Sequence, residues 1–154
     1  MPNGNIFDAS LRATADLFAP YLAGSVGGLA IAISSNWLDD VSRNALESSL
    51  DTLGYGTDCL AYIALNGSGN ETLPLDAQAL FALVEGLDPK CLIATDSQAA
   101  GILAEAFHVK QILNAYARFQ GRDTVAFSDF ADLMNSPEEK QQAWHLLKKL
   151  PKLN

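Results

Sequence analysis

The chain has 154 residues, 49% of them hydrophobic, and a formal net charge of −8 at pH 7. A chain of this length suits one domain over residues 1–154 with a sizeable buried core. No apolar run approaches the ~20 residues of a membrane-spanning helix, and the N-terminus carries no signal-like segment. We therefore expect a cytoplasmic protein without a membrane partner.

The charge is unevenly distributed along the sequence. Residues 1–89 contain 2 basic and 11 acidic residues, whereas residues 90–154 contain 8 basic and 7 acidic residues. Proteins that bind nucleic acid gain affinity from cations that release the counterions of phosphates. The acidic balance therefore argues against duplex nucleic acid as a partner and favours another protein.

Apolar runs alternate with amphipathic segments along the chain. The apolar runs predict buried strands at 26–33, 59–65, 91–95 and 124–127. The amphipathic segments predict helices at 5–19, 36–54, 76–85, 98–107 and 138–150, with a helical turn at 130–134. Residues 109–123 are ambiguous and favour a loop with some helix. This alternation predicts a three-layer α/β domain with a mostly parallel four-stranded sheet flanked by helices.

Capping residues support the predicted helix ends. Asp39 or Asp40 can cap the second helix, and Gly54 can end it in the left-handed conformation. Asp96 or Ser97 can cap the fourth helix, and Pro137 suits the first position of the last one.

No metal site or cofactor is expected. Cys59 and Cys91 each lie near the start of a predicted strand and are expected to be buried thiols. They form no Cys-x-x-Cys motif, and His108 and His145 are expected at the surface without an orienting partner. The sequence contains neither a P-loop nor a Gly-x-Gly-x-x-Gly motif.

Polar residues follow each predicted strand. Because ligands of parallel sheets bind at the carboxyl ends of the strands, these residues could line a pocket. The alternative is that they only cap helices and close turns, as Ser, Asp and Asn commonly do. The pocket candidates are Ser35, Asn36, Trp37, Asp39, Asn66 and Asp129, and Asp129 is also the one candidate catalytic residue.

Six segments together resemble the uracil-DNA glycosylase superfamily, in particular its small iron–sulfur branch. They are the Leu-Gly-ended helix 46–54, the Ala-Tyr-Ile-Ala strand 61–64, the Leu-Asp-Pro strand 87–94, the helix segment 99–103, the Gln-Gly step 120–121, and the segment 127–144 that leads into the last helix. The resemblance covers roughly residues 29–150. It implies a uracil-DNA-glycosylase-like fold and, for an intact member, removal of uracil from DNA.

The functional positions of that family are replaced in this chain. The base-reading Asn falls on Leu65, with Asn66 one residue away and so on the other face of a strand. The catalytic His-Pro falls on Asp129 and Phe130, and the loop after the first strand, 33–37, lacks the family's Pro and carboxylate. The cluster cysteines are absent. The resemblance therefore implies a degenerate member.

Three hypotheses follow. The first is a non-catalytic protein-interaction or scaffolding module. Its candidate surface is the C-terminal helix with Trp144 and Lys148–Lys152. The alternative for Trp144 is that it packs into the core. The second is an enzyme with altered chemistry, a hydrolase related to DNA glycosylases, that uses Asp129 with Asn36 or Asp39 on a small nucleotide or nucleoside. The third is a divergent uracil-DNA glycosylase.

Asp129 separates the first two hypotheses. In the first, its carboxylate caps the following helical turn by accepting the N–H of Ala131 or Asp132; in the second, it faces an open crevice. The sequence leaves the oligomeric state open.

Overall fold

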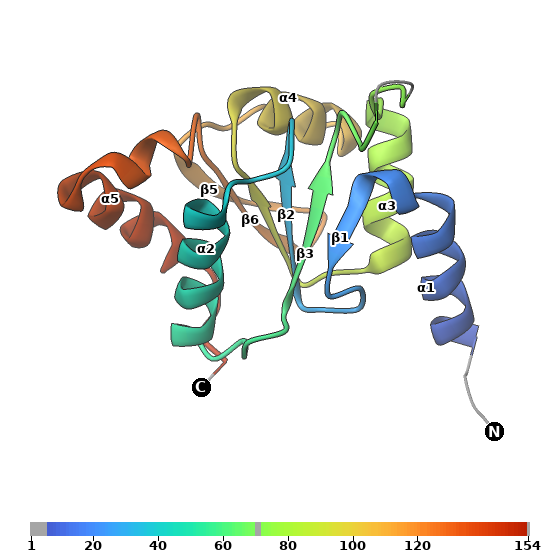
Figure 1. Cartoon of the computed structure of the whole chain (residues 1–154), viewed down its shortest axis with the longest axis horizontal. Coiled ribbons are helices and arrows are strands. Elements are labelled where there is room, and N and C mark those ends of the chain that lie inside the picture. The colour runs from blue at the N-terminus through green and yellow to red at the C-terminus, as the bar shows by residue number, and fades with distance from the viewer. Residues whose placement is uncertain (1–5, 70–71, 154) are drawn as a thin grey trace.

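The computed structural model describes residues 6–69 and 72–153 and is built on one six-stranded mixed sheet (Figure 1). The strand order is β1-β3-β2-β4-β6-β5. The strands are β1 (Leu22–Gly24), β2 (Ala30–Ser34), β3 (Leu60–Ala64), β4 (Cys91–Ala94), β5 (Ala115–Phe119) and β6 (Arg122–Ala126). The four inner strands are parallel to one another, and the two edge strands, β1 and β5, are antiparallel to their neighbours.

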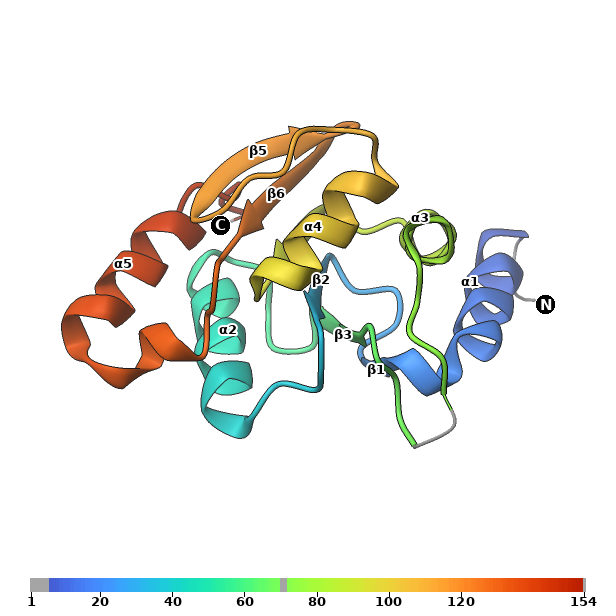
Figure 2. The ribbon, with the colours of Figure 1, turned by 90° about the horizontal axis from the view of Figure 1, so that it is seen from above.

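Helices cover both faces of the sheet, which gives the expected three-layer α/β architecture (Figure 2). The helices are α1 (Ile6–Leu17), α2 (Asp40–Thr52), α3 (Ala77–Leu87), α4 (Ser97–Ala106) and α5 (Pro137–Leu147), with short 3₁₀ helices η1 (Ala19–Tyr21) and η2 (Asp132–Asn135). Helices α1, α3 and α4 lie on one face, and α2 and α5 lie on the other. No helix of the described ranges is long and apolar enough to cross a membrane.

The central strand β2 shows why the parallel strands are apolar on both sides. Its alternate residues contribute to two separate cores, with Ile31 and Ile33 facing α3 and α4, and Ala30 and Ala32 facing α2 and α5. All five residues of β2 are buried. A strand covered by helices on both faces has no solvent side and so no polar alternation.

The start of β2 is later than predicted, at Ala30 rather than residue 26. Residues 25–28 form a turn in which the Gly28 N–H donates to the Ser25 carbonyl at 3.1 Å. A Cβ on Gly28 would lie 2.4 Å from the Cys59 carbonyl oxygen, so only glycine allows the backbones to approach this closely.

The prediction of four strands is wrong, because both edge strands were missed. β1 has only three residues and directly follows η1, so it offers too little sequence for a pattern. β5 lies within the segment predicted as a loop with some helix. It forms a hairpin with β6 through Gln120 and Gly121, whose φ angles of 50° and 86° suit a two-residue primed turn.

The predicted caps are confirmed. The Asp39 and Asp96 carboxylates each accept the backbone N–H of the residue three positions later, at 2.7 and 2.8 Å. Gly54 has a φ of 95°, and Pro137 occupies the first turn of α5. Local sequence therefore sets the helix ends, while strand pairing decides the sheet edges.

Candidate functional site at the carboxyl ends of the strands

The topology points to the space between β2 and β4. From β2 the chain adds β3 on one side, then returns to add β4 on the other side. Ligands of parallel sheets bind where the direction of strand addition reverses, outside the carboxyl ends of the strands. In this chain Ser34 and Ser35 meet Thr95 and Asp96 at that point.

Asp96 is the centre of this region. Its carboxylate accepts the Ser35 N–H at 2.8 Å, the Ser35 hydroxyl at 2.7 Å and, as the cap of α4, the Ala99 N–H at 2.8 Å. Beneath it, the buried hydroxyls of Ser34 and Thr95 lie 2.6 Å apart. The residues that would face a ligand are thus hydrogen-bonded to one another across the two strands.

Similar side-chain pairs join the other strand ends. The Asn66 amide donates to Asn36 at 3.0 Å, which links the ends of β3 and β2. The Asn114 amide donates to the Ser128 hydroxyl at 3.2 Å and accepts the Ser128 N–H at 3.1 Å, which links the segments flanking β5 and β6. The carboxyl edge of the sheet is therefore bridged by its own polar side chains.

Asp129 caps the turn that follows β6, as predicted. Its carboxylate accepts the Asp132 N–H at 3.1 Å, and its side chain is exposed. Its backbone forms an isolated antiparallel bridge with Asp96. In the described part of the chain it makes no hydrogen bond to Asn36 or Asp39, the partners that the altered-enzyme hypothesis requires.

The remaining pocket candidates from the sequence do not all lie at one place. Asp39 is used as the cap of α2. Trp37 is 40% exposed and donates its indole N–H to the Ser68 hydroxyl at 3.2 Å. Trp37 also lines a small cavity of about 190 Å³ with Arg43 and Tyr62. Ser35 with Asp96, and Asn36 with Asn66, are the pairs that the fold brings together.

Tyr62 in that small cavity is held by charged neighbours. Its hydroxyl donates to Glu47, and the Arg43 guanidinium lies 5.3 Å from the centroid of its ring. Burial, with this hydrogen bond to Glu47, raises the pKa of the Tyr62 phenol. The phenol is therefore a neutral hydrogen-bond donor in the fold.

The two thiols lie in the interior, as expected. Cys59 and Cys91 are buried and free, and β2 lies between their strands, so they are not neighbours in the sheet. The Tyr55 hydroxyl lies 3.1 Å from the Cys91 Sγ. Burial raises the pKa of both thiols, which makes them poor nucleophiles near neutral pH. Among residues 6–69 and 72–153, no group of three or more His, Cys, Asp or Glu is placed to hold a metal.

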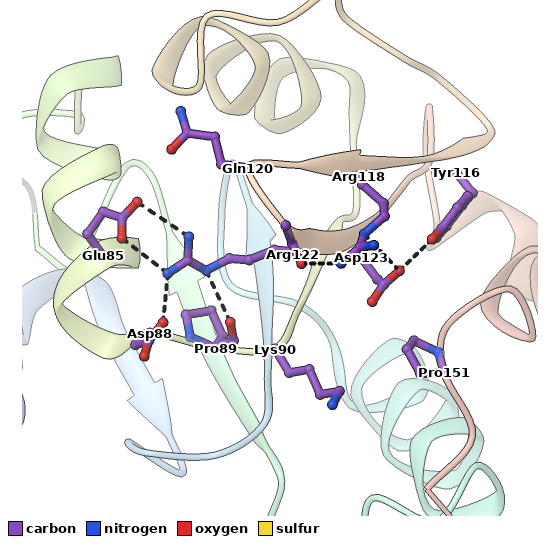
Figure 3. A pocket seen from close by; sticks show the side chains of 11 residues that line it. Glu85, Asp88, Pro89, Lys90, Tyr116, Arg118, Gln120, Arg122, Asp123 and Pro151 are labelled. Carbon is purple, nitrogen blue, oxygen red and sulfur yellow. Dashed lines mark hydrogen bonds and ion pairs between the residues drawn. The ribbon is translucent and has the colours of Figure 1, made fainter.

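A larger cavity of about 680 Å³ lies at the opposite end of the sheet (Figure 3). Arg122 crosses its wall and donates to Glu85 at 3.1 and 3.3 Å, to Asp88 at 2.8 Å and to the Pro89 carbonyl at 3.1 Å. Sequence reasoning missed this cavity because it depends on the β5–β6 hairpin, and the segment that contains β5, 109–123, is predicted as a loop with some helix.

The second half of this cavity contains Tyr116, Arg118 and Asp123 (Figure 3). The Tyr116 hydroxyl donates to Asp123, which raises the pKa of the phenol, and the Arg118 Nε lies 3.8 Å from the same carboxylate. Both arginines of the cavity therefore have carboxylate partners within its walls.

No protein-family model and no curated protein matches this chain. The fold is a three-layer α/β domain with a mixed, six-stranded sheet, and the resemblance to uracil-DNA glycosylases remains a prediction from sequence.

Proposed function

We propose that this chain is a non-catalytic, uracil-DNA-glycosylase-like α/β domain that acts as a protein-interaction or scaffolding module. The hydrogen bonding of Asp96 carries the proposal. A catalytic or ligand-binding carboxylate directs its free oxygen lone pairs toward the ligand. Asp96 instead accepts three protein donors, from Ser35 and Ala99, at the one point where the topology favours a ligand.

The replaced family positions support the same conclusion. Leu65, at the position of the base-reading Asn, is 1% exposed, and the adjacent Asn66 amide is bonded to Asn36. Asp129, at the position of the catalytic His, caps a helical turn. A carboxylate at that place would repel an anionic leaving group that a His would stabilise.

The net charge of −8 favours a protein partner over a nucleic acid. We therefore expect the retained α/β framework to present a surface, while the crevice of the strand ends serves the stability of the domain.

A thermal-unfolding screen against uracil, nucleosides and nucleotides tests the proposal. A ligand at 100 times its Kd stabilises a fold by about 2.7 kcal/mol, so even weak binders raise the unfolding temperature measurably. We expect no member of the panel to raise it.

The variant Ser35→Ala removes one crevice donor, and Ser48→Ala, on the exposed side of α2, is the matched control. A ligand that stabilises the wild-type chain and Ser48→Ala, but not Ser35→Ala, would contradict the proposal and make the altered-enzyme hypothesis the better account.

A further inference from the structure

Helices α2 and α5 lie side by side on one face of the sheet (Figures 1 and 2). Their side chains leave a groove between the two helices. We call this the α2–α5 groove; it has a volume of about 280 Å³. It is lined by Val41, Ala45 and Ser49 from α2, Lys140, Ala143, Trp144 and Leu147 from α5, and Phe130 and Met134 before α5.

The lining of the α2–α5 groove is mainly apolar. Phe130 is fully buried, and its ring packs edge-on against Phe127 of the core. Val41, in the first turn of α2, is 60% exposed. Trp144 is half-buried: one part of its indole packs against the core, and another part lines the groove.

Two cations flank this apolar lining. Lys140 lines the groove itself, and the Lys148 ammonium lies 6.0 Å from the centroid of the Trp144 ring. Within the part of the chain that the structure describes, neither lysine forms an ion pair, whereas Arg43 and Arg118 do. Cations without a carboxylate partner, placed beside an apolar groove, complement acidic side chains of a partner.

We propose that the α2–α5 groove binds an acidic amphipathic helix of a partner protein. One large apolar side chain of that helix fills the cavity, and its carboxylates contact Lys140 and Lys148. The inference rests on the proposed interaction function and names the surface and the class of partner.

The dimensions favour a helix over a small molecule. Small-molecule pockets usually have volumes of roughly 300–1,000 Å³, and this cavity lies below that range. A cavity of this size suits a single anchoring side chain, the usual centre of a protein–protein interface. Two helices form the walls, so a third helix can pack along them, and the free strand edges of the sheet lie elsewhere, at β1 and β5.

The test uses a displayed library of helix-forming peptides about 20 residues long, with apolar anchors spaced at i, i+4 and i+7 and flanking positions randomised between acidic and basic residues. The purified chain selects from the library, and affinities are measured by fluorescence anisotropy. Val41→Arg blocks the groove, and Leu73→Arg, at a residue 78% exposed in the loop before α3, is its matched control.

The charges are tested by reversal. Lys140→Glu combined with Lys148→Glu reverses the groove cations, and Lys90→Glu combined with Lys110→Glu makes the same change in net charge at exposed lysines outside the groove lining. All variants are first checked by thermal unfolding, where exposed substitutions should change stability by less than about 0.5 kcal/mol.

We expect acidic peptides to be enriched and to bind Val41→Arg at least about tenfold more weakly, since an anchor pocket is an energetic centre. The Lys140→Glu and Lys148→Glu variant should lose acidic peptides and gain affinity for their lysine-substituted versions, and both controls should bind like the wild type.

Three results would overturn the inference: enrichment of no peptides or of basic ones, equal binding by Val41→Arg, or a dimer of the chain that Val41→Arg dissociates, which would make a second copy the occupant. None of these would restore catalysis to the crevice. A nucleotide that binds at Ser35, in contrast, would contradict the proposed function and leave the peptide result unaffected.

Discussion

The carboxyl edge of the sheet and the α2–α5 groove use their polar groups differently. At the edge, Asp96 accepts donors from Ser35 and Ala99, and Asn36 accepts from Asn66. In the groove, Lys140 projects beside apolar side chains without a carboxylate partner among the described residues. The polar groups of the edge are therefore bonded within the protein, whereas Lys140 is free of an ion pair among the described residues.

The cavity at the amino end of the parallel strands shares one feature with each of these regions: it is an open space, like the groove, and its arginines have partners within the protein, like the polar groups of the edge. It is the larger space, about 680 Å³, yet Arg122 is bonded to Glu85 and Asp88 and Arg118 lies beside Asp123. Volume alone does not distinguish a binding site from a polar cleft whose charges stabilise the fold.

Replacing Asp96 by Ala gives the largest expected effect. The change removes the cap of α4 and leaves the Ser35 N–H without its acceptor. We expect the free energy of unfolding to fall by about 2–4 kcal/mol, the sum of a lost cap and an unsatisfied donor. Chemical denaturation measures this loss.

Asp96→Asn is the matched control, since it keeps one carbonyl acceptor and should cost less. If Asp96→Ala were as stable as the wild type, the carboxylate would not be a structural element, and a role toward a ligand would have to be reconsidered.

Alkaline pH should destabilise the fold because it favours ionisation of buried thiols and phenols, which the folded protein holds in their neutral form. The fold raises the pKa of Cys59, Cys91, Tyr55 and Tyr62, in each case mainly by burial. Because the folded pKa is the higher one, their contribution to stability is complete below the unfolded values, about 8.5 for thiols and 10 for phenols. It is lost as the pH rises above those values.

We expect the free energy of unfolding to be steady up to about pH 8 and then to fall by up to about 1.4 kcal/mol per pH unit for each such group. Urea denaturation between pH 7 and pH 10.5 follows the decline, and Cys91→Ala should make it shallower. A flat profile through pH 10.5 would mean that these groups titrate in the folded protein as they do in the unfolded chain.

Replacing Asp129 by Ala should have a smaller effect than replacing Asp96. Among the residues that the structure describes, its exposed carboxylate accepts the Asp132 N–H alone, so the expected loss is about 0.5–2 kcal/mol of stability. Binding of an acidic peptide in the α2–α5 groove should be unchanged. A variant that kept full stability but lost binding or turnover of a small substrate would favour the altered-enzyme hypothesis.

Short-range signals made most of the fold predictable. Asp39, Asp96 and Pro137 mark helix ends by hydrogen bonding or φ preference within one turn, and the sequence shows such features directly. The edge strands lack comparable signals. β5 depends on a two-residue turn formed by Gln120 and Gly121, where the more familiar Asn-Gly would have indicated a hairpin.

The sequence predicts where the polar residues of the candidate site lie, but not which of them form hydrogen bonds with one another. The sequence indicates that Ser35, Asn66 and Asp129 follow strands and so share one edge. Which of them meet depends on the central position of β2, because that brings Ser35 to Asp96 and Asn36 to Asn66. The α2–α5 groove was missed, since its two walls are about 100 residues apart in the sequence. Trp144 is the lining residue that the sequence analysis places on a candidate interaction surface.

Affinity for nucleic acid should be weak. With a net charge of −8, we expect binding to single- or double-stranded DNA no tighter than ~10⁻⁴ M at physiological salt. Anisotropy titration with labelled oligonucleotides measures this. Submicromolar binding that weakens as salt rises would reveal a phosphate-binding surface and would contradict the preference for a protein partner.

The central claim is that the carboxyl edge of the sheet performs no catalysis, and uracil release tests it most directly. Single- and double-stranded oligonucleotides with one uracil are incubated with the purified chain, and abasic sites are revealed by alkaline cleavage. We predict no cleavage above the protein-free control, because the resemblance to uracil-DNA glycosylases places Leu65 and Asp129 where that superfamily has its base-reading Asn and catalytic His. Cleavage by the wild-type chain that disappears in Ser35→Ala and Asp129→Ala would contradict the claim.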